Sequence, residues 1–186
     1  MSQMGFYFDQ TRCTGCYTCA VACKDWHDID AGPANWMRVD ALEEGTFPDV
    51  FVAYLAGPCY HCEKPSCVTI CPVDAIEKRT ADGIVLVDQE KCIGKKKCNS
   101  KCLKACPWEV PQFEDEEGAK MQKCNFCVDR IEKGQQTICV EACPMYALDA
   151  GPIQELREKY GDTAEAHGFR NFKKVGPSIT FKPKVK

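Results

Sequence analysis

The sequence predicts a small α+β protein made of two halves of short strands and helices, followed by a C-terminal helix and an extended tail. Three observations predict this. Sixteen cysteines fall into four groups of four within 186 residues, and none is left over. Short apolar segments flank or interrupt these groups, as expected for short strands and helical turns. From residue 152 onward the pattern changes to that of an amphipathic helix.

The cysteine spacing is typical of chain segments that bind iron–sulfur clusters. The first group runs C-x2-C-x2-C-x3-C, which is the spacing of bacterial ferredoxins. The second runs C-x2-C-x4-C-x3-C, the third C-x5-C-x3-C-x3-C and the fourth C-x2-C-x11-C-x3-C, and each of these three ends in Cys-Pro. Sixteen thiolates are the number that four [4Fe–4S] clusters require. The groups are Cys13, Cys16, Cys19 and Cys23; Cys59, Cys62, Cys67 and Cys71; Cys92, Cys98, Cys102 and Cys106; and Cys124, Cys127, Cys139 and Cys143.

Disulfides and zinc are the alternative uses of these cysteines. Disulfide frameworks belong mainly to small secreted domains, whereas this chain is longer and shows no secretory segment. Zinc sites usually separate two C-x2-C pairs by a longer loop, and only the fourth group has such a loop. The agreement of four groups therefore favours four [4Fe–4S] clusters and one-electron transfer.

The charge of the chain argues against binding to nucleic acid or anionic lipid, and its hydropathy argues against membrane insertion. The formal net charge is −3, and sixteen thiolates with four oxidised cores bring it to about −11. Such an acidic protein is not expected to bind nucleic acid or anionic lipid. No apolar run approaches the ~20 residues that span a bilayer, so direct membrane insertion is not expected.

The first predicted elements are short. Residues 6–8 read as an apolar strand, and residues 20–22 suit a helical turn between two cysteines. Residues 25–58 are predicted to be a long connection rich in turn residues. Its aromatic side chains are expected to be available to pack over a cluster: Trp26, Trp36, Phe47 and Phe51.

The sequence pattern in the middle of the chain predicts one helical turn and two hairpins. Residues 68–70 repeat the pattern of the first helical turn. Residues 75–76 and 84–87 are predicted to pair as a hairpin that turns at residues 82–83. A second hairpin is predicted between Cys106 and Cys124, turning at residues 116–118.

The C-terminal helix is predicted over residues 152–160. Pro152 suits the first helical position, Ile153 and Leu156 share one face, and Gly161 is a plausible terminator. The remaining residues contain too few apolar side chains to fold alone. They are expected either to lie along the body or a partner, or to form a loosely ordered terminus.

The cysteine groups are expected to work in pairs. In two-cluster ferredoxins, three cysteines of one run bind one cluster and the fourth, before proline, binds the other. A nested arrangement would pair the second group with the third and the first with the fourth. A sequential arrangement would pair the first with the second and the third with the fourth, and spacing alone allows both.

Three segments and the end of the chain resemble one known family. Residues 13–25 (CTGCYTCAVACKD), 57–67 (GPCYHCEKPSC) and 138–152 (ICVEACPMYALDAGP) are similar to the iron–sulfur electron-transfer (beta) subunits of the dimethyl sulfoxide reductase family. The tail, with its P-x-I-x-F-K-P pattern, extends the similarity over nearly the whole chain. The resemblance implies two nested ferredoxin-like halves, an outer one of residues 1–50 and 107–150 and an inner one of residues 51–106, with residues 151–186 as a C-terminal helix and partner-docking tail.

The resemblance also implies the nested pairing of ligands. The four expected ligand sets are Cys13, Cys16, Cys19 and Cys143 (cluster 1); Cys23, Cys124, Cys127 and Cys139 (cluster 2); Cys59, Cys62, Cys67 and Cys106 (cluster 3); and Cys71, Cys92, Cys98 and Cys102 (cluster 4).

The family further implies the partners. The main one is a large catalytic subunit that carries a molybdenum or tungsten bis-pterin centre, sometimes joined by a membrane subunit that reacts with quinone, or by a soluble redox carrier. Such proteins stay in the cytoplasm, or reach the periplasm folded with a catalytic subunit that carries the signal.

The third cysteine group departs from the family pattern. Close relatives have C-x2-C-x2-C-x3-C-P, whereas here Lys95, Lys96 and Lys97 separate Cys92 from Cys98. Four cysteines remain, but the altered loop makes an atypical cluster 4 conceivable, such as a [3Fe–4S] centre. These lysines are expected either to offset cluster charge or to form an ordinary solvated face.

The three histidines are not expected to bind iron. His61 lies between two cysteines and is expected to tune a cluster from outside its ligand shell, or simply to pack. His27 and His167 carry no ligand pattern and are interpreted as incidental.

No motif of substrate chemistry is found, whether a dinucleotide or phosphate loop, a haem site or a nucleophile elbow. We therefore expect a non-catalytic subunit that passes single electrons between the catalytic subunit and a quinone module or carrier. The alternatives are a free-standing polyferredoxin, a hydrogenase subunit and a structural zinc module.

Overall fold

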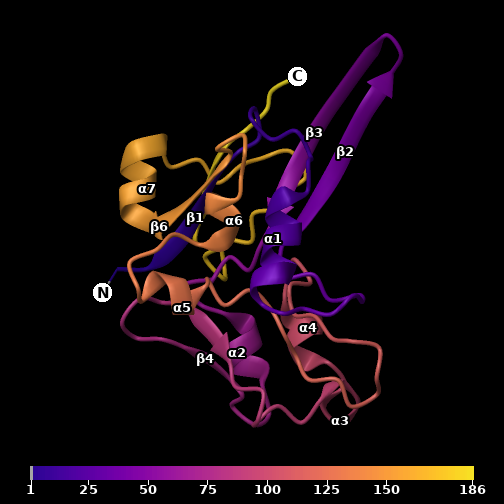
Figure 1. Cartoon of the computed structure of the whole chain (residues 1–186), viewed down its shortest axis with the longest axis vertical. Helices are drawn as coiled ribbons and strands as arrows, with labels where there is room; N and C mark the ends of the chain where they lie inside the picture. The colour runs from indigo at the N-terminus through magenta and orange to yellow at the C-terminus, as the bar shows by residue number, and fades with distance from the viewer. Residues whose placement is uncertain (1) are drawn as a thin grey trace.

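A three-stranded sheet joins the two ends of the chain. The computed structural model describes residues 2–186. Strand β1 (Met4–Asp9) pairs antiparallel with β6 (Leu148–Pro152) on one side and parallel with β7 (Ile179–Lys182) on the other. Figure 1 shows α7 (Ile153–Tyr160) beside β1 and β6. The C-terminal residues therefore complete the sheet that the N-terminus begins.

Helix α7 is held to this sheet by its apolar face. Ile153 and Leu156 are buried, and the ring of Tyr160 stacks on Tyr7 with centroids 3.7 Å apart. Pro152 ends β6 and is the N-cap of the helix, so the helix begins at Ile153, one position after the predicted first helical residue. Gly161 follows the helix with φ +94°, a conformation that favours glycine.

The cysteines lie in and around short helices. These helices are α1 (Thr18–Trp26), α2 (Ser66–Ile70), α3 (Lys95–Cys98), α4 (Lys101–Ala105), α5 (Val128–Ile131) and α6 (Ile138–Glu141). A short hairpin of β4 (Ile76–Lys78) and β5 (Val85–Val87) lies between α2 and α3 in the chain, as the sequence predicted.

One prediction about the connections was wrong, and a second was confirmed only in part. Residues 25–58 contain a ribbon of two nine-residue strands, β2 (Arg38–Thr46) and β3 (Asp49–Gly57), which projects from the body in Figure 1. Phe51, Ala53 and Leu55 alternate with less buried residues, which is the strand period that we missed. Residues 107–123 do turn near the predicted position, where the Ala119 N–H donates to the Glu116 carbonyl at 2.9 Å. One antiparallel bridge, Gln112 to Gln122, takes the place of the strands of the predicted second hairpin.

The aromatic side chains of the connection 25–58 do not all pack over cysteines. Phe47 lies at the tip of the ribbon and is 92 % exposed, so its predicted contact is wrong. Phe51 packs edge-on against His167, whose imidazole contacts the Glu44 carboxylate at 3.0 Å. Trp36 contacts the main core.

Cysteines form part of the main core. Phe6, Phe8, Phe126 and Phe181 are fully buried at its centre. The same cluster of buried side chains includes four cysteines: Cys23, Cys59, Cys124 and Cys139. The apolar core and the cysteine sites are therefore one packed unit.

Substitution of Thr180 by valine tests how firmly β7 belongs to the fold. The Thr180 hydroxyl is fully buried, donates to the Gly161 carbonyl and accepts the Thr163 N–H at 3.1 Å. Thr180→Val leaves these groups unpaired, so we expect the free energy of unfolding to fall by about 1–3 kcal/mol. Anaerobic denaturant titration of the iron-loaded protein measures this, with Thr163→Val, which removes no such bond, as control. An unchanged midpoint would contradict the prediction.

Candidate metal centres

Four cysteines from the first and fourth groups surround one cavity, named site 1. Cys13, Cys16, Cys19 and Cys143 line it together with apolar side chains such as Phe8 and Leu148. Burial raises the pKa of the Cys19 thiol to about 12, and the neighbouring charges of Cys13 and Cys143 add to this shift. The Ala147 N–H donates to Cys143 Sγ at 3.3 Å. Gly15 has φ +67°, and a Cβ there would lie 2.3 Å from the Tyr54 ring, so the loop around site 1 requires glycine.

Four cysteines from the second and third groups surround another cavity, named site 4. Cys71, Cys92, Cys98 and Cys102 line it with a mostly apolar wall that includes Ile76, Val87, Phe113 and Met121. The Ala75 N–H donates to Cys71 Sγ at 3.3 Å, and the Met121 N–H donates to Cys92 Sγ at 3.4 Å.

The inserted lysines of the third group lie outside site 4. Residues 95–98 form α3, so the longer spacing is taken up as an extra helical turn. The Lys95 ammonium donates to the Glu114 and Asp115 carbonyls, and Lys96 forms an ion pair with Glu117. Asn99 and Ser100 have positive φ and turn the chain from α3 into α4, which carries Cys102. The altered loop thus still brings four thiols to one cavity.

The remaining cysteines form two more groups, named site 2 and site 3. Site 2 is Cys23, Cys124, Cys127 and Cys139. Burial raises the pKa of Cys23, and the charges of the other three thiols raise it further. Site 3 is Cys59, Cys62, Cys67 and Cys106, where burial raises the pKa of Cys62 and the other three again add to the shift. In all four groups, three cysteines come from one sequence group and one from its partner group.

Left-handed residues shape the loop that carries site 2. Phe126 and Cys127 both have positive φ, an uncommon conformation for residues with a side chain. The turn aims the Phe126 N–H at Cys124 Sγ, 3.4 Å away, and the Ile138 N–H lies 3.5 Å from Cys127 Sγ. Strained backbone of this kind is common at functional sites, and here it directs backbone N–H donors toward cysteine sulfur atoms.

The donor sets suit iron–sulfur clusters better than zinc or disulfides. No two of the sixteen cysteines form a disulfide in the part of the chain that the structure describes. Among residues 2–186, no three histidine, cysteine or acidic side chains converge closely enough to bind a single metal ion. Zinc needs four ligands within about 2.0–2.3 Å of one ion, whereas a cubane spreads its ligands over four irons. Because burial raises the pKa of most of these thiols, cluster binding must displace their protons.

His61 lies close to the cysteines, as predicted for a residue outside the ligand shell. It is fully buried, and burial holds its pKa well below the ordinary value, so the ring is neutral. Its Nδ1 accepts the Val85 N–H at 2.9 Å, which leaves the proton on Nε2, 3.8 Å from Cys124 Sγ.

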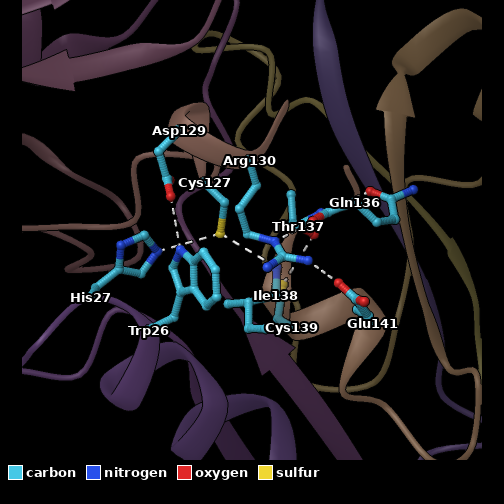
Figure 2. A network of polar contacts seen from close by, with 10 residues as sticks. All are labelled: Trp26, His27, Cys127, Asp129, Arg130, Gln136, Thr137, Ile138, Cys139 and Glu141. Carbon is cyan, nitrogen blue, oxygen red and sulfur yellow. Dashed lines mark hydrogen bonds and ion pairs between the residues drawn. The ribbon is translucent and has the colours of Figure 1, made fainter. Parts of the chain in front are cut away.

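Three residues near the sites were missed by sequence reasoning. His27 was interpreted as incidental, but its Nε2 lies 3.3 Å from Cys127 Sγ. Figure 2 shows this contact as a dashed line. The signal was its spacing, since His27 follows Cys23 by four residues, at the C-terminal cap of α1. Thr137 Oγ1 lies 3.4 Å from Cys139 Sγ, and buried Lys123 directly precedes Cys124. No sequence motif identifies these two residues.

Within the described residues, no helix is both long enough and apolar enough to cross a membrane.

Comparison with known proteins agrees with the geometry of the four sites. A sequence profile described as a 4Fe-4S dicluster domain matches residues 50–153, and a second profile of that description matches residues 12–76. Two dicluster domains correspond to four [4Fe–4S] clusters.

Curated relatives cover nearly the whole chain. One chain of the anaerobic dimethyl sulfoxide reductase of Escherichia coli (strain K12) is 41 % identical over 98 % of this protein and 89 % of its own length. The thiosulfate reductase electron transfer subunit of Salmonella typhi is 38 % identical over 79 % of this protein and 74 % of its own length. The formate dehydrogenase iron-sulfur subunit of Wolinella succinogenes is 37 % identical over 83 % of this protein and 84 % of its own length. The chain belongs to the iron–sulfur electron-transfer subunits of the dimethyl sulfoxide reductase family.

Proposed function

We propose that sites 1 to 4 each bind one [4Fe–4S] cluster through the four cysteines that define the site. The clusters supply one-electron carriers, and the protein sets their spacing, burial and hydrogen bonding. The observation that supports this ligand assignment is the lining of the two cavities. Site 1 combines cysteines of the first and fourth groups, and site 4 combines those of the second and third. Sequential pairing would have mixed the groups differently.

The same pairing supports a nested division of the chain. The outer half would be residues 1–50 with 107–150, which carry sites 1 and 2. The inner half would be residues 51–106, whose cysteines form sites 3 and 4. Residues 151–186 would dock a partner through the parts of the tail that lie outside β7.

The electrons would pass between a large catalytic subunit with a molybdenum or tungsten bis-pterin centre and either a quinone-reactive membrane subunit or a soluble carrier. Exposed apolar side chains support contacts near sites 1 and 4. Tyr17 and Met145 line site 1 and are exposed, and Ile93 lines site 4 and is exposed. The complex would work in the cytoplasm, or in the periplasm after export with its catalytic subunit.

Anaerobic purification of the natural complex tests this function. We expect a stable large subunit that contains molybdenum or tungsten, and about sixteen iron and sixteen acid-labile sulfide per chain. Iron and sulfide without a pterin-containing subunit would instead support a free-standing polyferredoxin or a hydrogenase subunit. Zinc without sulfide would overturn the cluster assignment.

Cysteine substitution tests the nested pairing. In the purified chain, Cys143→Ser is expected to perturb the EPR signal that Cys13→Ser also perturbs, and to leave the signal perturbed by Cys124→Ser intact. If Cys143→Ser and Cys124→Ser instead perturbed the same signal, the ligand sets would be wrong.

A further inference from the structure

Site 2 is the most enclosed of the four groups. Its cysteines are 5 %, 8 %, 4 % and 5 % exposed for Cys23, Cys124, Cys127 and Cys139. A [4Fe–4S] cluster with four thiolates carries net negative charge, and reduction adds one more. Because burial disfavours the more highly charged state, this enclosure lowers the tendency of a bound cluster to accept an electron. A working carrier at this position therefore needs compensating donors.

His27 provides one such donor. The imidazole stands at the C-terminal end of α1, and its backbone N–H donates to the Cys23 carbonyl at 3.2 Å. The ring packs against Trp36 with centroids 4.8 Å apart, which holds Nε2 at 3.3 Å from Cys127 Sγ. A thiolate has no proton to donate, so the hydrogen bond requires the proton on His27 Nε2. Helix α1 thus directs the Cys23 thiolate and the His27 donor toward the same site.

Thr137 provides the second donor from the opposite side. Figure 2 shows His27 and Thr137 approaching different cysteines of the site. The Thr137 side chain is fully buried, and its hydroxyl lies 3.4 Å from Cys139 Sγ. With Cys139 as a thiolate, the hydroxyl must be the donor.

The side-chain hydroxyl donors of site 1 lie at the surface. The Thr18 hydroxyl is 3.3 Å from Cys16 Sγ, and the Thr14 hydroxyl also donates to that sulfur. Thr18 and Cys16 are both exposed. Water therefore competes with the Thr18 contact, whereas Thr137 is sealed from solvent.

We propose that His27 and Thr137 are positioning residues that raise the midpoint potential of the site 2 cluster by donating hydrogen bonds to the thiolates of Cys127 and Cys139. The inference rests on the ligand set proposed above. Hydrogen bonds to sulfur strengthen as the cluster gains an electron, so they stabilise the reduced state more than the oxidised state. The two donors act on different ligands of one cluster, so their effects must fall on the same redox transition.

EPR-monitored redox titration of the iron-loaded chain tests the proposal. His27→Phe keeps an aromatic ring against Trp36 but removes the donor, and Thr137→Val keeps the shape but removes the hydroxyl. Each is expected to lower the reduction equilibrium constant of one cluster by roughly tenfold, which is about 59 mV for one electron. Thr137→Ser keeps a hydroxyl and should restore most of the potential. Thr18→Val is the matched control and should affect a different cluster, with a smaller shift.

Two results would overturn the proposal. One is an unchanged midpoint in both His27→Phe and Thr137→Val with full iron and sulfide content. The other is that these variants shift two different transitions, or all four equally. Failure of the ligand assignment would be visible separately, because the cysteine substitutions described above would then perturb the wrong signals. Iron analysis detects the loss of a cluster in a donor variant. In that case the double variant His27→Gln with Thr137→Ser, which retains both donors, is titrated instead. Its midpoint potential is expected to be near that of the native protein.

Discussion

Removal of iron and sulfide is expected to abolish the cooperative unfolding transition of this protein. The main apolar core contains Cys23, Cys59, Cys124 and Cys139, so the cluster sites and the core are packed together. Without clusters, the walls of sites 1 and 4 lose the groups against which they pack. Small metal-dependent domains obtain much of their folding free energy from the metal. We therefore expect the apoprotein to be largely unfolded at neutral pH.

Anaerobic circular dichroism of chelator-treated and untreated protein checks this expectation. The iron-loaded protein should show a sharp thermal transition, and the apoprotein should lose near-ultraviolet signal and melt without one. Reconstitution with iron and sulfide should restore the transition, which controls for damage by the chelator. A sharp apoprotein transition near that of the loaded protein would contradict the expectation.

Any residual apoprotein structure should be less stable at high pH. Burial raises the pKa of the Cys19 and Cys124 thiols to about 12, above the ordinary value of about 8.5. A raised pKa in the folded state means that the unfolded chain loses its protons first. The contribution of these two protonated thiols to the stability of the folded state is thus fully present below about pH 8.5 and is lost as the pH rises toward 12. Far-ultraviolet circular dichroism of the apoprotein across this range should show a residual ordered signal that falls as pH rises.

The sequence predicted chemistry better than shape. Cysteine count and spacing identify iron–sulfur binding because ligand chemistry depends on local sequence. The four-residue spacing that places His27 one turn after Cys23, at the end of α1, is likewise local, and it could have been recognised. The proposed nested pairing could not be derived from spacing alone, because it depends on contacts between cysteine groups that lie apart in the sequence. The β2–β3 ribbon was missed because turn residues in residues 25–58 hid the alternation of Phe51, Ala53 and Leu55.

Lys123 shows most clearly what local sequence cannot reveal. Its side chain is 3 % exposed, and its ammonium donates to the Cys124 carbonyl at 2.9 Å and to the Val85 carbonyl. His61 accepts the N–H of the same Val85, so two side chains occupy the open edge of β5. Within residues 2–186, no carboxylate forms an ion pair with Lys123. The fourth cysteine group and the β4–β5 hairpin are joined through this lysine.

The Lys123 charge acts on two sites at once. Burial raises the pKa of the Cys67 and Cys124 thiols to about 12, and the positive charge of Lys123 offsets part of that rise in both. Cys67 belongs to site 3 and Cys124 to site 2. A positive charge that stabilises thiolates in both sites also stabilises the reduced clusters that they would bind.

Substitution of Lys123 by methionine is therefore expected to lower both stability and two midpoint potentials. Two buried carbonyl oxygens lose their donor, at about 1–3 kcal/mol each, so the free energy of unfolding of the loaded protein should fall by several kcal/mol. Redox titration should show the site 2 and site 3 clusters becoming harder to reduce, with sites 1 and 4 unchanged. Denaturant titration and EPR of the same anaerobic samples measure both effects.

Lys78→Met is the matched control for this substitution. The Lys78 ammonium also donates to two backbone carbonyls, those of Cys62 and Glu63, at 3.0 and 2.8 Å, but the residue is only half-buried. Water can replace the lost ammonium there, so both the stability and the site 3 potential should change less than in Lys123→Met. If Lys123→Met destabilises the protein while all four midpoints stay in place, the lysine serves only to bind β5. A joint shift of the site 2 and site 3 midpoints would instead show that one buried charge couples the outer and inner cysteine groups.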